Sequence, residues 1–301
     1  MNKDRKQGII AILIANTIFG LNIPVTKQIV AEWMSPMGYT TTRMVLGAII
    51  FWIISVFQNK DSVKGKDLII IFIGGLIGSL GTQFLFSKAL EYTTPVVFSL
   101  IMALTPVVVL LMSAIFLKEV IPVRKALGIL ISISGAAMII LVSGSSDHQG
   151  SNNVLGIVVA LFCVLCYGGY MMLTRNVSMK YKPVTVAKWM FFISAIVAFP
   201  LSYQELPEQR MFSAEANFEA YSLMAFAIVF STTLAFFLMP VALKRLEANT
   251  VSIFMNIQPI VALVVGQDVF SWDKPVAVLL VVTGVYLVTV QKKKAMHEIS
   301  E

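Results

Sequence analysis

Ten apolar stretches of about 20 residues follow one another along the 301-residue chain, and they constrain its fold more than any other feature. A helix needs roughly 20 residues to cross about 30 Å of hydrocarbon. Backbone polar groups must be hydrogen-bonded internally in lipid, and the alternation typical of barrel strands is absent, so each stretch is predicted to be a transmembrane helix. The predicted spans are 8–30, 37–57, 67–90, 95–117, 125–143, 154–175, 184–204, 219–243, 248–270 and 275–291.

The composition agrees with a lipid environment. Charged residues make up 13% of the chain, compared with about 25% in a typical soluble domain. The net charge is +7, but the basic residues occur in short clusters between apolar stretches, which is the pattern that orients membrane proteins. We therefore predict an all-α integral membrane protein with the lipid bilayer as a partner, and we expect no nucleic-acid partner.

The positions of Lys and Arg predict the orientation of the chain. If the N-terminus is cytoplasmic, 17 of the 23 basic residues fall in cytoplasmic segments, and the external loops hold only Arg210 and Lys274. The remaining four lie within spans: Lys27, Arg43, Lys88 and Lys188. This asymmetry predicts a multi-pass protein of the inner (cytoplasmic) membrane with both termini in the cytoplasm.

The two halves of the chain resemble each other. Glycine, proline and aromatic positions recur after 148 to 153 residues, in the pairs Gly8 and Gly156, Phe19 and Tyr167, Pro106 and Pro259, and Gly135 and Gly284. Each half contains five predicted spans, and an odd number makes the second half enter the membrane from the opposite side. We therefore predict two inverted five-helix repeats, 1–147 and 148–301, with a substrate site between them near the middle of the membrane.

Three segments of the chain resemble the EamA family of the drug/metabolite transporter superfamily. They are 16–27 (NTIFGLNIPVTK), 89–140 and 242–288, and their order along the chain is specific. The resemblance implies two five-helix repeats and transport of amino acids, sugars or related metabolites. The chain departs from the family after the fourth and ninth spans, where Lys118-Glu119 and Gln267-Asp268 replace the usual Gly-Glu.

Charges within the spans are informative because a charge at the bilayer centre costs at least about 2.5 kcal/mol. No Asp or Glu lies at mid-depth, which disfavours both a proton relay through a central acid and a cationic substrate. Arg43 lies about two turns inside the second span, and Lys27 and Lys88 lie near outer span ends. Together they predict an electropositive outer vestibule in which Arg43 holds a carboxylate or phosphate through two parallel bonds. The alternative is that these side chains extend to the lipid headgroups.

Other polar and aromatic side chains near mid-depth complete the predicted substrate site. With Arg43, the candidate substrate-binding residues are Asn16, Asn22, Gln83, Ser99, Tyr167, Tyr170, Trp189, Thr232 and Asn256. The alternative is hydrogen bonding between helices for the polar residues, and core packing for the aromatic ones. Pro106 and Pro259 predict kinks that free a carbonyl toward a cavity, or kinks that serve packing alone.

The sequence contains no Walker A, HExxH or GxSxG pattern, so we expect no catalytic residues and no cofactor. Cys163 and Cys166 have CxxC spacing in an apolar span and are expected to pack rather than to bind a metal. Gly74 and Gly78 form a GxxxG face that allows close helix contact. The predicted state is a monomer or a weak homodimer.

These observations favour a transporter over an enzyme. The expected function is secondary transport of a small-molecule substrate across the inner membrane by alternating access, with export the favoured direction. The expected substrate is an amino acid or related compound that is neutral or anionic. The alternatives are a channel, a non-transporting membrane partner subunit, or a membrane-embedded lipid-modifying enzyme, which would need acidic or histidine clusters that the chain lacks.

Overall fold

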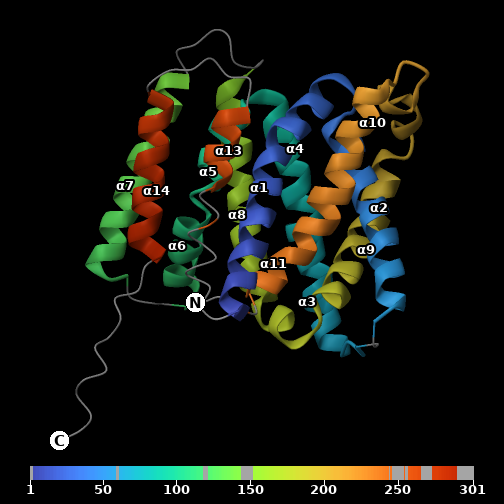
Figure 1. Ribbon diagram of the computed structural model, residues 1–301, viewed down its shortest axis with the longest axis horizontal. Coiled ribbons are helices and arrows are strands. Elements are labelled where there is room, and N and C mark those ends of the chain that lie inside the picture. Colours follow the sequence, from blue (N-terminus) through green and yellow to red (C-terminus); the bar gives the residue numbers. More distant parts are fainter. Residues whose placement is uncertain are drawn as a thin grey trace, which may run out of the picture.

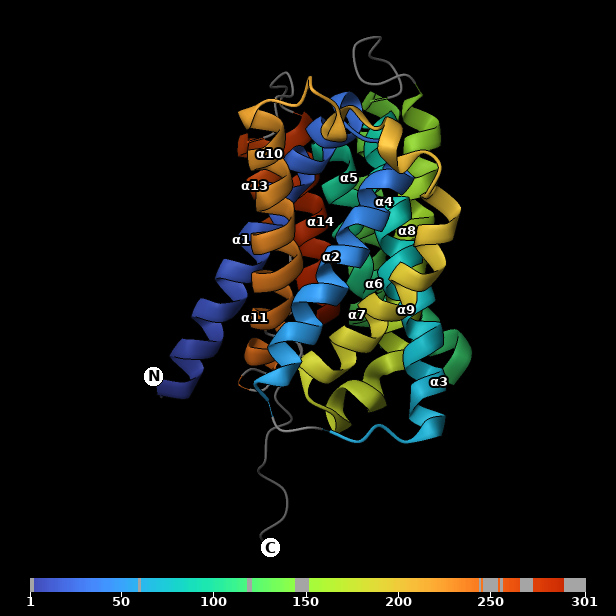
Figure 2. The ribbon, with the colours of Figure 1, turned by 90° about the vertical axis from the view of Figure 1, so that its right-hand side faces the viewer.

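The computed structural model describes residues 3–58, 61–117, 121–143, 152–243, 245, 254, 257–265 and 273–289. Regular structure in these residues is entirely helical, and the longer helices lie side by side along one common direction (Figures 1 and 2). Among the described residues, seven helical segments are long and apolar enough to cross a membrane: Asp4–Glu32, Pro36–Val56, Gly65–Tyr92, Pro95–Met112, Asn153–Thr174, Pro183–Ser202 and Phe218–Met239. The all-helical membrane fold is therefore confirmed, whereas ten spans in two inverted repeats stay a prediction.

The first half of the chain forms the elements up to α7. They are α1 (Lys3–Glu32), α2 (Pro36–Val56), α3 (Gly65–Gly74), η1 (Gly75–Gly81), α4 (Thr82–Tyr92), α5 (Pro95–Met102), α6 (Thr105–Leu117) and α7 (Val123–Ser143). The sequence specifies where α2 begins, because Pro36 suits a first helical position and the Ser35 hydroxyl accepts a hydrogen bond from the Gly38 N–H at 3.0 Å.

The second half forms the elements from α8 onward. They are α8 (Asn153–Lys180), α9 (Pro183–Ser202), the short turns η2 (Leu206–Glu208) and η3 (Arg210–Phe212), α10 (Phe218–Ala225), η4 (Phe226–Ala235), α11 (Phe236–Leu243), α13 (Ile257–Val265) and α14 (Asp273–Thr289). The α9 helix begins at Pro183 in the same way that α2 begins at Pro36.

A π-helical segment interrupts one long helix in each half. These segments are η1, between α3 and α4, and η4, between α10 and α11. The 153-residue offset found in the sequence carries 75–81 onto 228–234, which lies within η4. Hydroxyl groups bond carbonyls five residues earlier, as from Thr82 to Ile77 at 3.1 Å and from Thr232 to Ala227 at 2.9 Å. Such wide turns are rare and are frequently found at functional sites.

The predicted fourth span is divided into α5 and α6 by a turn at Ala103 and Leu104. Pro106 has no N–H and cannot bond the Met102 carbonyl four residues earlier. The Thr105 hydroxyl donates to that carbonyl instead, at 2.5 Å. The kink at Pro106 is thus present, but the freed carbonyl has a partner in its own segment and needs no ligand. The carbonyl that Pro259 would free belongs to residue 255, which lies outside the described residues.

Glycines allow the closest helix contacts. The α7 and α14 helices pack together at one edge of the bundle (Figure 1), and a Cβ placed on Gly284 would lie 2.5 Å from the Ser132 nitrogen. The GxxxG face meets α8, since Cβ atoms on Gly74 and Gly78 would lie 2.4 Å from Thr174 and 2.3 Å from Tyr170. The close helix contact expected of the GxxxG face is therefore made within the chain.

The two ends of the bundle carry different segments. The start of α1 and the end of α14 lie at the same end as the connections after α2 and α8, and 203–217 lies at the opposite end (Figures 1 and 2). An even number of membrane crossings produces this arrangement. Following the predicted orientation, the end with 203–217 is called the outer end and the other the inner end.

Candidate functional site

A buried arginine joins three helices in the interior of the bundle. Arg43 of α2 is 2% exposed. Its guanidinium donates from Nε to Thr232 Oγ1 at 2.9 Å, from Nη1 to Gln83 Oε1 at 2.7 Å and from Nη2 to Ser231 Oγ at 3.4 Å. Gln83 comes from α4 of the first half, and Ser231 and Thr232 come from η4 of the second. The cluster of these four residues is called the Arg43 cluster.

The partners of Arg43 are electrically neutral. In the described part of the chain, the ion pairs are made by other residues, and none includes Arg43. A buried charge without a counter-charge is costly, so neutral hydrogen bonds only partly offset the loss of water. An anionic ligand would supply the missing charge, and the guanidinium fork can bind a carboxylate with two parallel hydrogen bonds.

A row of polar groups holds Arg43 from the outer side. The Arg43 Cζ lies 5.4 Å from the centroid of the Tyr39 ring. The Tyr39 hydroxyl lies 3.0 Å from Thr26 Oγ1, which also accepts a hydrogen bond from Asn22 Nδ2 at 3.3 Å. The Asn22 Oδ1 atom is buried and has no hydrogen-bond partner among the described residues. The row therefore fixes Arg43 and leaves one buried acceptor for a donor group.

The site is walled on one side by aromatic rings. A Cβ on Gly47 would lie 2.6 Å from Phe191 Cδ1 and 3.1 Å from Thr232 Cγ2, so Phe191 lies beside the Arg43 cluster. Phe191 contacts Phe51 and Phe236 with ring centroids 5.3 and 5.6 Å apart. These three rings, called the aromatic wall, place an apolar surface next to a cation.

Several of the candidate residues predicted from the sequence lie close together. The structure brings together the candidates Arg43, Gln83 and Thr232, and it connects Asn22 to them through Thr26 and Tyr39. Thr26 and Tyr39 were not among the candidates. The signal for Tyr39 was its position four residues before Arg43, because such residues lie on one helix face.

The other polar candidates lie apart from the Arg43 cluster. Asn16 donates to the Ile12 carbonyl at 3.0 Å and accepts from Gln258 at 2.8 Å, which ties α1 to α13. Ser99 donates to the Val96 carbonyl of its own helix at 2.8 Å. Asn256 lies outside the described residues.

The aromatic candidates pack against other parts of the bundle. Tyr170 covers Gly78, and its ring centroid lies 6.0 Å from that of Tyr167. Trp189 packs against Trp52 and Phe192, with centroids 5.6 and 6.1 Å apart, and both neighbours are more than one-third exposed. Trp189 therefore belongs to an aromatic group at the surface of the bundle.

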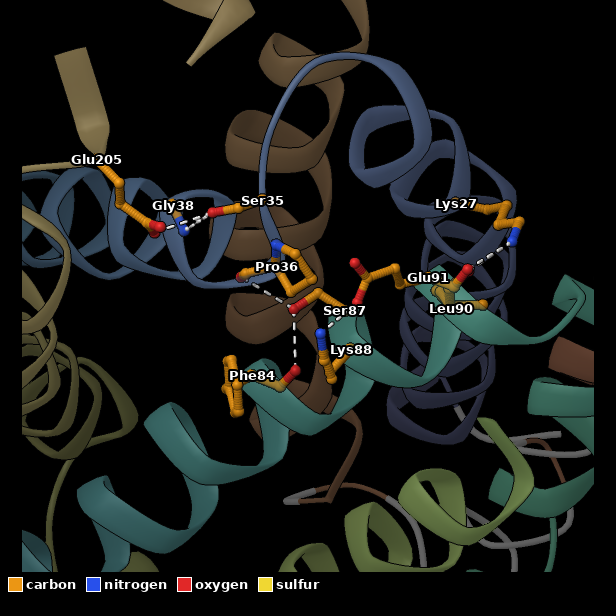
Figure 3. A network of polar contacts seen from close by, with 10 residues as sticks. All are labelled: Lys27, Ser35, Pro36, Gly38, Phe84, Ser87, Lys88, Leu90, Glu91 and Glu205. Atoms are coloured by element: carbon orange, nitrogen blue, oxygen red, sulfur yellow. Dashed lines mark hydrogen bonds and ion pairs between the residues drawn. The ribbon is translucent and has the colours of Figure 1, made fainter. Parts of the chain in front are cut away.

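The interpretation of Lys27 and Lys88 as an electropositive vestibule is wrong. Lys27 Nζ donates to the Leu90 carbonyl at 2.7 Å at the end of α4, and Lys88 pairs with Glu91 at 2.6 Å (Figure 3). The cations thus compensate helix-end carbonyls and a carboxylate. A surface pocket of about 280 Å³ at this end is lined mostly by neutral residues, and its charged lining residues are Glu32, Glu91, Glu208 and Arg210.

Comparison with known proteins agrees with this architecture. The EamA-like transporter family matches residues 6–141 and 154–290. A solved structure, titled "Crystal structure of protein", superposes with a TM-score of 0.65 at 18% identity, covering 96% of this chain and 99% of that one. That likeness shows a shared fold.

Relatives with similar sequences are named as transporters. An "Uncharacterized transporter" of Archaeoglobus fulgidus is 25% identical, over 93% of this chain and 97% of its own length. The "Uncharacterized transporter YyaM" of Bacillus subtilis is 24% identical, over 85% and 83% of the two chains. A "Probable terminal-alkyne amino-acid exporter" of Streptantibioticus cattleyicolor is 24% identical, over 78% and 75%.

These names indicate a multi-pass membrane transporter of a small molecule rather than an enzyme. The family match covers most of both halves of the chain. The chain belongs to the EamA-like transporter family of the drug/metabolite transporter superfamily.

Proposed function

We propose that the chain is a secondary transporter that exports a small carboxylate-bearing metabolite, an amino acid or a related neutral or anionic compound, across the inner membrane by alternating access. The observation that carries the proposal is Arg43, which is buried in the interior of the helix bundle and bonded to neutral groups. A substrate carboxylate supplies the missing charge. The resemblance to a probable amino-acid exporter supports the direction and the substrate class.

Two features support the inverted repeats, 1–147 and 148–301, on which alternating access depends. The π-helical segments occur at matched positions of the two halves. The matched glycines Gly135 and Gly284 both lie where α7 meets α14, with Cβ positions 2.9 Å from Leu280 and 2.5 Å from Ser132. A two-fold relation that exchanges the halves would pair such equivalent residues at one crossing, and it would place the substrate site between the halves.

The chemistry of the site is unequal on its two sides. Seven residues after the proline that opens α2 lies Arg43, and seven residues after the proline that opens α9 lies Met190, next to Phe191. Met190 and Phe191 are both buried and apolar. A substrate with a carboxylate at one end, for Arg43, and an apolar group at the other, for the α9 side, fits this arrangement. Leucine is therefore a suitable probe.

The proposal is tested with three radiolabelled compounds in proteoliposomes: leucine, its α-keto acid and the amine left when leucine loses its carboxyl group. Leucine and the keto acid should move with saturable counterflow, and the amine should not, because it lacks the group that pairs with Arg43. Transport of the amine at the rate of leucine, or no movement of leucine and the keto acid above empty liposomes, would contradict the proposal. Counterflow also separates a carrier from a channel.

A further inference from the structure

The outer end of α2 is tied to the connection between α9 and α10. Ser35 is the N-cap residue of α2, and its backbone N–H donates to Gln209 Oε1 at 2.6 Å. Its hydroxyl donates to Glu205 Oε1 at 2.9 Å (Figure 3). Two residues away along each segment, the Met211 N–H donates to the Trp33 carbonyl at 3.2 Å. This set of contacts, between 33–35 and 205–211, is called the outer clasp.

The inner end of α9 is tied in the same manner to the connection between α2 and α3. Lys182 is the N-cap residue of α9, and its backbone N–H donates to Asp61 Oδ2 at 3.0 Å. Asp61 also accepts from the Thr185 hydroxyl at 3.2 Å. The hydrogen bond from the Lys182 N–H is the largest of the effects that hold the pKa of Asp61 below its ordinary value. The contacts of Asp61 with Lys182 and Thr185 are the core of the inner clasp.

A second carboxylate extends the inner clasp along α3. Asp67 accepts from the Tyr181 hydroxyl at 2.7 Å and pairs with Lys180. The Tyr181 hydroxyl in turn accepts from the Lys64 N–H at 3.1 Å. The inner clasp therefore joins 61–67 to 180–185.

The two clasps are equivalent under the exchange of the halves. In each, the N-cap residue stands directly before the helix-opening proline, and its N–H is bonded by a side chain from a connection of the other half. The exchange of α2 with α9 carries the α1–α2 connection onto the α8–α9 connection, and the α9–α10 connection onto the α2–α3 connection. Both clasps are closed in the same structure, and three residues of the Arg43 cluster between them, Arg43, Ser231 and Thr232, are buried.

We propose that the outer and inner clasps are the two gates of the Arg43 cluster, and that each must open in turn for the site to reach its side of the membrane. This inference rests on the proposed function and identifies the contacts that control access to that site. The structure is then the occluded state, with both gates closed.

The contacts in the clasps are weak enough to break and re-form, as gates require. The charged side chains of the inner clasp are partly exposed, with Asp61 24% and Lys182 41% exposed, so water replaces their bonds when they part. The middle of the α2–α9 pair is different, because Gly47 there meets the buried ring of Phe191 and Phe51 packs on the same ring. Separating that apolar contact exposes surface with no compensation, so it serves as the axis about which the ends open.

The test closes each gate with a covalent link in a background that carries Cys163→Ala and Cys166→Ala, which removes both native cysteines. The outer pair is Ser35→Cys with Glu205→Cys, the inner pair is Asp61→Cys with Thr185→Cys, and a short bifunctional thiosulfonate joins each pair reversibly. The control pair, Lys88→Cys with Glu91→Cys, replaces an ion pair at 2.6 Å within α4 and does not link the two halves. After linking, a Ser231→Cys reporter is freed from a photolabile protecting group by light, which leaves the links intact, and is labelled with a membrane-impermeant maleimide from each side.

The outer link should lower labelling from outside by about tenfold or more and leave labelling from inside, and the inner link should do the reverse. A reductant should restore both, and the control link should change neither. Labelling unaffected by the two links, or absent from both sides before linking, would overturn the gates. If the links control labelling but leucine and its keto acid are not transported, the result contradicts the proposed function and still supports the two gates.

Discussion

Gly284→Val should yield little or no folded protein. A Cβ at this position would lie 2.5 Å from the Ser132 nitrogen and 2.6 Å from the Gly128 carbonyl oxygen, both in the backbone of α7. No rotamer change relieves a clash with backbone, so α7 and α14 must move apart along their contact. Overpacking typically costs about 1–3 kcal/mol, and we expect the upper end of that range or more here. The measurement is the monodisperse fraction in detergent and the midpoint of thermal unfolding.

Gly65→Val is the matched control. Gly65 lies in the first turn of α3, and a Cβ there would meet nothing within 4 Å. Its yield and unfolding midpoint should stay near those of the unchanged chain. Equal yields and midpoints for Gly284→Val and Gly65→Val would show that the α7–α14 contact is not as close as described.

Arg43→Gln should abolish most transport of leucine and its keto acid while leaving the protein folded. A hydrogen bond to a charged group contributes about 1.5–3 kcal/mol, which corresponds to a loss of roughly 10- to 100-fold in affinity. Folding should not suffer, because the substitution removes a buried charge whose partners are neutral. Arg43→Lys keeps the charge but loses the planar guanidinium. Its transport rate should therefore lie between those of the unchanged chain and of Arg43→Gln.

Ser99→Ala is the control for Arg43→Gln. Ser99 is also buried in the bundle, but its hydroxyl bonds the Val96 carbonyl of its own helix. Transport by this variant should match that of the unchanged chain. Full transport by Arg43→Gln in the same experiment would remove Arg43 from the substrate site.

Helix positions follow closely from the sequence, since the predicted spans 37–57 and 184–204 correspond to Pro36–Val56 and Pro183–Ser202. Apolar length determines a membrane helix, and a proline indicates where it begins. The π-helical turns at η1 and η4 were not predicted, because they depend on hydroxyl contacts and on packing with neighbouring helices. The break at Ala103 and Leu104 was indicated by Pro106, but the role of Thr105 was not.

The site was predictable as a set of residue types and not as a geometry. The cost of a charge in lipid directed attention to Arg43, and the structure places the candidates Gln83 and Thr232 beside it. The same reasoning failed for Lys27 and Lys88, because it could not foresee that a helix end and Glu91 lie within reach. Which face of a span Trp189 occupies likewise depends on neighbours 100 or more residues away in the chain, such as Trp52.

The central claim, that a substrate carboxylate binds to buried Arg43, is tested most directly by ligand-induced stabilisation of the purified protein. Thermal unfolding is followed for the unchanged chain and for Arg43→Gln, each with leucine, its keto acid or the corresponding amine at saturating concentration. Leucine and the keto acid should raise the unfolding midpoint of the unchanged chain, because a ligand that binds only the folded state stabilises it. The amine should leave that midpoint in place, and Arg43→Gln should respond to none of the three. An equal rise in both proteins, or a rise with the amine as large as that with leucine, would contradict the claim.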